Sequence, residues 1–149
     1  VSSDAHRGGK LRFEDLEGRK RYEGFDAYAA SKLMNILHVR ALAKRLDPTR
    51  VTANALHPGV VATGFAQDEK SVFGRLVKLF APLLASPEQG ADTTIHLAAE
   101  PEGAETSGKY FVRRREKTPS AAARDDEAAE RLWAESERIT NAPAFPSTR

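Results

Sequence analysis

The feature that most constrains the fold is a long helix followed almost at once by a short apolar strand. Across residues 27–46, apolar side chains recur at helical spacing and form a wide stripe. Residues 51–57 are mostly apolar and are predicted to form a strand that Pro58-Gly59 ends. A short apolar strand of this kind is typical of a parallel sheet that is covered on both faces. The pair is therefore half of a β-α-β unit.

The two ends of this helix carry separate signals. The carboxylate of Asp26 can accept a free backbone N–H group, so Asp26 is the expected N-cap. Asp47-Pro48 is expected to end the helix, because the residue before a proline avoids the helical region. Before the helix, residues 4–25 are polar with little periodicity, and they predict a long connection of the kind found at active-site rims.

Later segments continue the alternation of helices and strands. They are predicted to be a helix over 87–99, a strand over 108–112 and an amphipathic helix over 124–140, with Leu132, Trp133 and Ile139 as its apolar contacts. Pro87 suits the first position of its helix, and Glu88 favours the positive end of the helix dipole. The order predicts an α/β fold, with ligands bound beyond the carboxyl ends of the strands.

The chain is expected to form one domain, with residues 141–149 as a flexible tail. It begins at Val1, and Val1-Ser2-Ser3 is typical of a buried strand running into a loop. We therefore expect residues 1–149 to be a partial domain, the tail of a longer protein.

Composition excludes several classes of function. A formal net charge of +2 argues against a dedicated nucleic-acid binder. The absence of cysteine excludes disulfides, thiolate metal sites and a cysteine nucleophile, and it fits a reducing, cytoplasmic location. The apolar runs are far shorter than the ~20 residues of a membrane span. His6 and His96 are too scattered to predict a metal site, and His57 is expected to pack or hydrogen-bond within a loop, with direct catalysis ranked second.

Tyr28 and Lys32 are the residues with the clearest chemical pattern. They lie four apart near the start of the predicted helix, which stacks them on one face. A nearby ammonium favours the phenolate form of a tyrosine, and such a tyrosine can exchange a proton with an alcohol or a carbonyl oxygen. The same ammonium can bind a ribose hydroxyl. By itself the pair is also compatible with an ordinary surface contact on a helix.

The surrounding motifs add to this pattern. Tyr28-Ala-Ala-Ser-Lys32 is preceded by Val1-Ser2-Ser3 and followed by Pro58-Gly-Val-Val-Ala-Thr63. In this order and spacing, the three motifs resemble the short-chain dehydrogenase/reductase superfamily across nearly the whole chain. The stretch Val1 to His6, the long insertion before Tyr28 and the Arg131–Ser136 segment resemble its retinol-dehydrogenase-like subgroup.

The resemblance implies a fold, a reaction and a role for each matched residue. The fold would be the C-terminal part of a Rossmann-like, doubly wound parallel sheet with flanking helices. The reaction would transfer hydride between NAD(P)(H) and an alcohol, aldehyde or ketone, with NADP favoured over NAD. The resemblance implies that Ser3 hydrogen-bonds the substrate oxygen and that Tyr28 is the general acid/base. Lys32 would lower the pKa of Tyr28 and bind the nicotinamide ribose. The nicotinamide pocket would be shaped by Pro58, Gly59 and Val61, and Thr63 would reach the carboxamide or a phosphate.

The most apolar stretch, residues 71–84, has three interpretations. It is a core helix, a lid over a lipophilic substrate, or a membrane-surface contact helped by Arg75 and Lys78, and the last ranks behind the other two. The resemblance also implies a possible homo-oligomer formed through helices that flank the active site.

The chain also departs from the family pattern. The glycine-rich phosphate loop after a first strand is missing, and the adjacent Gly8-Gly9 lies in a polar loop. A non-catalytic truncated fragment that lacks the cofactor-phosphate site is therefore the main alternative. An enzyme that reduces a ring double bond, as protochlorophyllide reductases do, is a third reading, which the tail and the missing cysteine disfavour.

Overall fold

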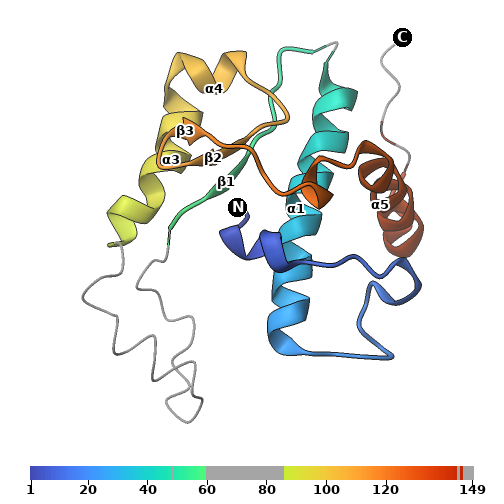
Figure 1. Ribbon diagram of the computed structural model, residues 1–149. Coiled ribbons are helices and arrows are strands. Elements are labelled where there is room, and N and C mark those ends of the chain that lie inside the picture. The colour runs from blue at the N-terminus through green and yellow to red at the C-terminus, as the bar shows by residue number, and fades with distance from the viewer. Residues whose placement is uncertain (48, 60–85, 144, 146–149) are drawn as a thin grey trace.

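The computed structural model describes residues 1–47, 49–59, 86–143 and 145 (Figure 1). Its α-helices are α1 (Gly24–Leu46), α3 (Pro87–Ala99), α4 (Pro101–Glu105) and α5 (Asp126–Thr140). Its strands are β1 (Ala55–His57), β2 (Tyr110–Val112) and β3 (Arg115–Glu116), and short 3-10 helices are η1 (Asp4–Gly8), η2 (Phe13–Asp15) and η4 (Ala122–Arg124).

The strands form one sheet in the order β1-β2-β3. β1 and β2 run parallel with Ala55 opposite Tyr110, whereas β3 returns antiparallel to β2. The crossover from β1 to β2 includes helices α3 and α4, as a parallel connection requires. The predicted α/β fold is therefore confirmed.

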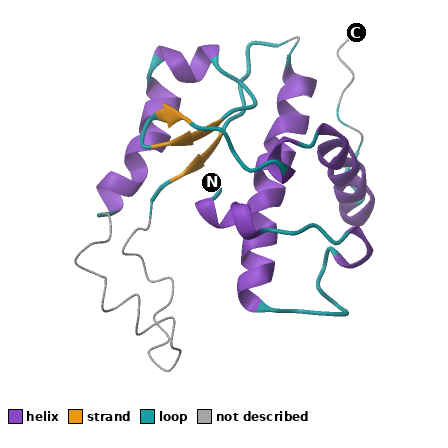
Figure 2. Ribbon diagram, viewed as in Figure 1, coloured by secondary structure: helices purple, strands orange, loops and turns teal. Residues whose placement is uncertain are grey.

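Alternation along the strands sends side chains to two helical layers (Figure 2). Ala55 and Tyr110 are buried in the same cluster as the apolar face of α1. Leu56 and Phe111 are also buried and point to the opposite face, where α3 lies. Cover on both faces explains why the first two residues of each strand are both apolar and both buried, rather than every second one.

Helix α1 is the central support of the molecule. Its buried residues are Ala29, Leu33, Ile36, Leu37 and Ala41. Helix α5 packs beside it through Leu132 and Trp133, both buried (Figure 1). The third predicted contact of α5 is wrong, since Ile139 is 44% exposed.

Several predicted boundaries need correction. α1 begins at Gly24, so Asp26 lies inside its first turn and the expected cap is wrong; Glu23 occupies the cap position without a side-chain bond. The strand predicted over 51–57 is limited to Ala55–His57. Just before it, the amide of Asn54 bonds Thr106 and Lys109, so its side chain replaces part of the strand ladder.

Other boundaries are close to the prediction. The helix over 87–99 is confirmed, and the strand predicted over 108–112 starts at Tyr110. The helix predicted over 124–140 starts at Asp126, where Asp125 caps it. The connection over 4–25 contains η1 and η2, which polar composition alone does not predict.

Two further predictions concern the ends and the apolar stretch. The segment 71–84 lies outside the described residues. The flexible tail stays a prediction, although Phe145 packs edge-on against Trp133 with ring centroids 5.8 Å apart. Within the part of the chain that is described, no helix is both long and apolar enough to cross a membrane.

Candidate active site

Ser2 ties the start of the chain to both β1 and α1. Its backbone N–H donates to the carbonyl of Leu56 at 2.7 Å, and its hydroxyl donates to the carbonyl of Lys32 at 2.7 Å. Beside it, the Asn35 side chain donates to the carbonyl of Val1 at 2.9 Å. Only 2% of Ser2 is exposed, so these bonds lie away from solvent. Residues 1–2 thus line the edge of β1 that β2 leaves open.

Ser3 follows directly and begins η1. Its Oγ accepts the backbone N–H of Ala5 at 3.2 Å, the usual role of an N-cap serine. A hydroxyl carries one hydrogen to donate besides its acceptor lone pairs, so Ser3 Oγ keeps a donor for another oxygen. Because Ser2 bonds the carbonyl of Lys32, Ser3 lies beside the α1 turn that carries Lys32.

Tyr28 and Lys32 occupy adjacent turns of α1. The Lys32 Nζ lies 5.3 Å from the centroid of the Tyr28 ring, within the range of a cation–π contact. Both side chains are half-buried, whereas the residues that follow each of them, Ala29 and Leu33, are buried in the core. The pair therefore lies on one helix face, as the spacing predicts, and its helix is held in place by buried neighbours.

The carboxyl ends of β1 and β2 border an open cleft of about 640 Å³. Its lining includes Asp4, His57, Gly59 and Arg113. Gly59 has a φ of 89°, a left-handed conformation that favours glycine, directly after β1 and Pro58. Open α/β sheets bind nucleotides at this end of the strands, so Pro58 and Gly59 lie at the expected edge. Val61 and Thr63 lie outside the described residues.

His57 points from β1 toward η1. Its Nε2 lies 3.9 Å from a carboxylate oxygen of Asp4. Its Nδ1 is buried without a hydrogen-bond partner among the described residues. Burial is the main cause that lowers the pKa of His57, and the charge of Asp4 opposes it. The partly buried ring agrees with the packing role expected for His57, although the residue ends strand β1 and does not lie in a loop.

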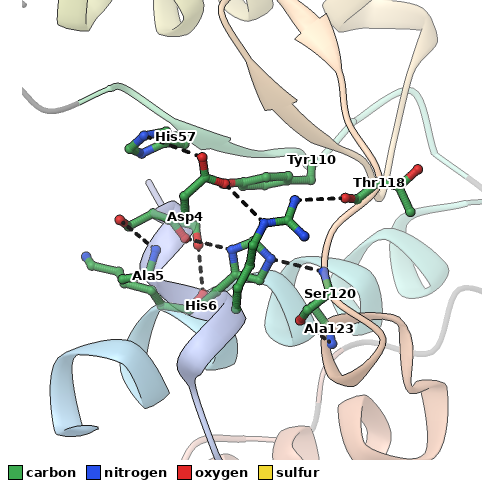
Figure 3. Close-up of polar contacts among 12 residues, drawn as sticks. Asp4, Ala5, His6, His57, Tyr110, Thr118, Ser120 and Ala123 are labelled. Atoms are coloured by element: carbon green, nitrogen blue, oxygen red, sulfur yellow. Dashed lines mark hydrogen bonds and ion pairs between the residues drawn. The ribbon is translucent and has the colours of Figure 1, made fainter. Parts of the chain in front are cut away.

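A cluster of polar side chains around Asp4 and His6 was not predicted from the sequence (Figure 3). Asp4 accepts the Tyr110 hydroxyl at 3.1 Å, and Arg7 lies 3.7 Å from the same carboxylate. The His6 ring bonds the carbonyl of Ser3 and the backbone N–H of Ser120. Burial and the Asp4 carboxylate raise the pKa of Tyr110, so this tyrosine stays a neutral donor. Asp4 and Tyr110 are more than 100 residues apart in sequence, and so are His6 and Ser120. No local pattern could have paired them.

The structure thus brings four of the predicted residues to one edge of the sheet. Pro58 and Gly59 follow β1, and Ser3 follows Ser2, which is bonded to β1 at Leu56. The bond from the Ser2 hydroxyl joins that edge to the turn of Lys32. Lys32 and Gly59 are the described residues that would hold the ribose and border the nicotinamide of a dinucleotide at this edge. Among the described residues, no glycine-rich loop opens a helix to cradle the phosphates.

Comparisons with known proteins agree with this geometry. A family model described as short chain dehydrogenase matches residues 15–72. Mouse (Mus musculus) retinol dehydrogenase 12 is 46% identical over 133 residues, which are 89% of this chain and 42% of that protein. Human (Homo sapiens) retinol dehydrogenase 13 is 41% identical over an alignment of 155 residues, which covers 100% of this chain and 46% of that protein. The chain spans less than half the length of these curated relatives.

A solved structure shares the same arrangement. It is the crystal structure of an uncharacterised protein from Mycobacterium paratuberculosis, with a TM-score of 0.73 and 28% identity over 98% of this chain and 50% of that one. The sequence motifs, the sheet edge and these similarities point the same way. The chain belongs to the short-chain dehydrogenase/reductase superfamily and, within it, to the retinol-dehydrogenase-like group.

Proposed function

We propose that this chain supplies the proton-transfer half of an NAD(P)-dependent oxidoreductase that interconverts an alcohol and its aldehyde or ketone. The observation that carries the proposal is the Tyr28–Lys32 pair on α1, held beside Ser3 by the bond from Ser2 to the carbonyl of Lys32. The dehydrogenase names of the relatives support the reaction class. When bound, the nicotinamide cofactor supplies or accepts the hydride.

Each residue then has a task that its geometry allows. The Tyr28 hydroxyl exchanges a proton with the substrate oxygen, and the Lys32 ammonium stabilises the phenolate that forms. The Ser3 hydroxyl, whose hydrogen is not used in its capping bond, donates to the same substrate oxygen. Lys32 also holds a ribose hydroxyl, while Pro58 and Gly59 border the nicotinamide. For Val61 the resemblance implies a place in the same pocket, and for Thr63 a bond to the carboxamide or to a phosphate.

The substrate class and the cofactor choice are further parts of the proposal. The relatives are named for retinol, an apolar alcohol, which supports a lipophilic alcohol or carbonyl compound as the substrate. NADP rather than NAD, a cytoplasmic location and a homo-oligomer stay predictions from the resemblance and composition. The alternative, a chain without catalytic activity, remains open because the phosphate loop is not among the described residues.

The test replaces Tyr28 by phenylalanine in the complete gene product. We expect NAD(P)H fluorescence titration to show unchanged binding, and kcat for aldehyde reduction to fall at least about 100-fold, because the acid is lost while the ring remains. Tyr22→Phe is the matched control, since Tyr22 is 71% exposed and should leave kcat unchanged.

The same titration on the 149-residue chain separates the alternative. Binding by the complete gene product and not by these residues alone would mean that the phosphate site lies elsewhere. Full activity in Tyr28→Phe, or no binding of either cofactor by the complete gene product, would contradict the proposed function.

A further inference from the structure

His6 is a buried imidazole for which the reaction gives no direct use. It lies in η1, three residues after Ser3, and is 0% exposed. The ring packs edge-on against Tyr110 with centroids 5.0 Å apart. Figure 3 shows it between Asp4 and the backbone of Ser120. A fully buried polar ring requires partners for both of its nitrogens.

Both nitrogens have such partners. Nδ1 lies 2.7 Å from the carbonyl oxygen of Ser3, and the backbone N–H of Ser120 donates to Nε2 at 3.1 Å. A carbonyl can only accept and an amide N–H can only donate. The partners therefore assign a neutral ring with its hydrogen on Nδ1. Burial lowers the pKa of His6, which agrees with a neutral imidazole.

Because the His6 ring bonds the carbonyl of Ser3, hydrogen bonds hold the backbone on both sides of Ser3. On the N-terminal side, Ser2 is bonded to Leu56 and to Lys32. On the C-terminal side, the Ser3 carbonyl accepts from the His6 backbone N–H at 3.0 Å as well as from Nδ1. With both neighbouring peptide groups fixed, the backbone of Ser3 has little freedom to rotate, and so the direction of its Cα–Cβ bond is set. The capping bond from the Ala5 N–H then holds Oγ about that bond.

We propose that His6 is a positioning residue that holds the Ser3 peptide, and with it the Ser3 hydroxyl, in place from the far end of the chain. The inference rests on the proposed function for the role of Ser3 in turnover. The Ser120 bond connects the site to the segment before η4, whose Ala123 is buried against the core. Arg7 adds a second link nearby by donating to the carbonyl of Thr118 at 3.2 Å.

Two substitutions separate the two bonds of the ring. In His6→Asn, the side-chain NH₂ replaces Nδ1–H and can still bond Ser3, while the Ser120 N–H loses its partner. In His6→Gln, the amide oxygen replaces Nε2 and can still accept from Ser120, while the Ser3 carbonyl loses its donor. Both variants lose one buried bond, so both should lose stability to a similar degree.

The two variants should differ in turnover. We expect kcat of the complete gene product to stay within about threefold in His6→Asn and to fall about 10- to 100-fold in His6→Gln, as misplacement of a reacting group does. The Kd for NAD(P)H should not change in either variant. Equal loss of kcat in both variants, or loss that follows their Tm values, would overturn the positioning role.

A spectroscopic measurement tests the geometry without turnover. Long-range ¹H–¹⁵N NMR of the unsubstituted protein should show the His6 hydrogen on Nδ1, the minor tautomer of a free imidazole. A hydrogen on Nε2 would overturn the inference. If the protein turns over no alcohol or carbonyl compound, the proposed function is wrong, whereas the tautomer still decides whether His6 holds Ser3.

Discussion

At the residue scale, Gly9 shows how closely η1 lies against the helix that carries Tyr28. A Cβ on Gly9 would lie 2.5 Å from the carbonyl oxygen of Ala29 and 3.0 Å from the Cβ of Leu33. Any side chain here must push the segment away from α1. We expect Gly9→Ala to lower the free energy of unfolding by about 1–3 kcal/mol, as overpacking does, and to reduce kcat because Ser3 moves relative to Tyr28. Urea unfolding and steady-state kinetics check both effects.

The neighbouring Gly8 is the matched control. A Cβ there would meet nothing within 4 Å, and its backbone has ordinary helical geometry. Gly8→Ala should leave kcat unchanged and stability equal or slightly higher, because alanine restricts the unfolded chain. Similar effects of the two substitutions would show that the contact with Ala29 is not restrictive.

The sequence predicts local geometry at this scale and little else. The stacking of Tyr28 and Lys32 follows from their spacing, because a helix places residues four apart on one face. The different constraints on Gly8 and Gly9 cannot be predicted, since they come from a helix some distance along the chain. The roles of His6 and Asp4 are hidden for the same reason, as their partners Ser120 and Tyr110 are distant in sequence.

At the element scale, charged groups align α5 with α1. Asp126 in the first turn of α5 accepts from Arg40 at 2.6 Å and lies 3.2 Å from Lys44 Nζ. Hydrogen bonds from Arg40 and Lys44 lower the pKa of Asp126. We expect Asp126→Asn to lower the free energy of unfolding by about 0.5–1 kcal/mol, the range of an exposed ion-pair network. Thermal unfolding at low salt measures this loss.

Glu127→Gln provides the comparison for Asp126→Asn. Both substitutions remove one negative charge from the first turn of α5, but Glu127 has no ion-pair partner among the described residues. Both variants should therefore lose the same stabilisation by the helix dipole. Their free energies of unfolding should differ by the contribution of the ion pairs. That difference should shrink in about 1 M salt, where the screening length is roughly 3 Å. A difference that is unchanged by salt would argue against the ion pairs as its source.

Elements whose ends are set locally are the ones that the sequence predicts well. α3 begins at Pro87 as expected, and Ser86 and Gln89 form a capping box at the same end. The strands are predicted too long, because strand ends depend on pairing. Asn54 uses its side chain where a ladder bond would otherwise form. The β2–β3 turn is also missed, since Arg113 and Arg114 adopt positive φ values that this residue type rarely shows.

At the scale of the whole molecule, the site depends on segments from both ends of the described chain. Residues 1–6, β1, β2 and the Ser120 segment converge on Asp4 and His6 (Figure 3). The α/β class could be predicted because alternating segments carry it. The convergence could not, because it is a property of the packed sheet and not of any one segment.

This convergence buries the imidazole of His6 fully and that of His57 in part, and so stability should depend on pH. Burial lowers the pKa of His6 and of His57. The two rings face each other, and around them lie the Ser3 carbonyl, Asp4, Arg7, Tyr110 and Arg113. Of these groups, only the Ser3 carbonyl and Asp4 favour protonation. An unfolded chain binds protons on both rings as the pH falls through about 6.5, while the folded protein keeps them neutral to lower pH. The stabilising effect is therefore complete above about pH 6.5 and is lost toward the folded pKa values.

We expect the urea midpoint of the complete gene product to be lower at about pH 5.5 than at about pH 7.5, since protonation then favours the unfolded state. The substitution His57→Asn should reduce this difference between the two urea midpoints, because one of the two imidazoles with a lowered pKa is gone. His38→Gln should retain it, because His38 is exposed on α1. Asp126 adds to acid sensitivity only below about pH 4, near the ordinary carboxyl range, and does not affect this comparison. A midpoint that does not change with pH would mean that neither ring is held neutral by its surroundings. An equal change in all three proteins would mean that His57 is not held neutral.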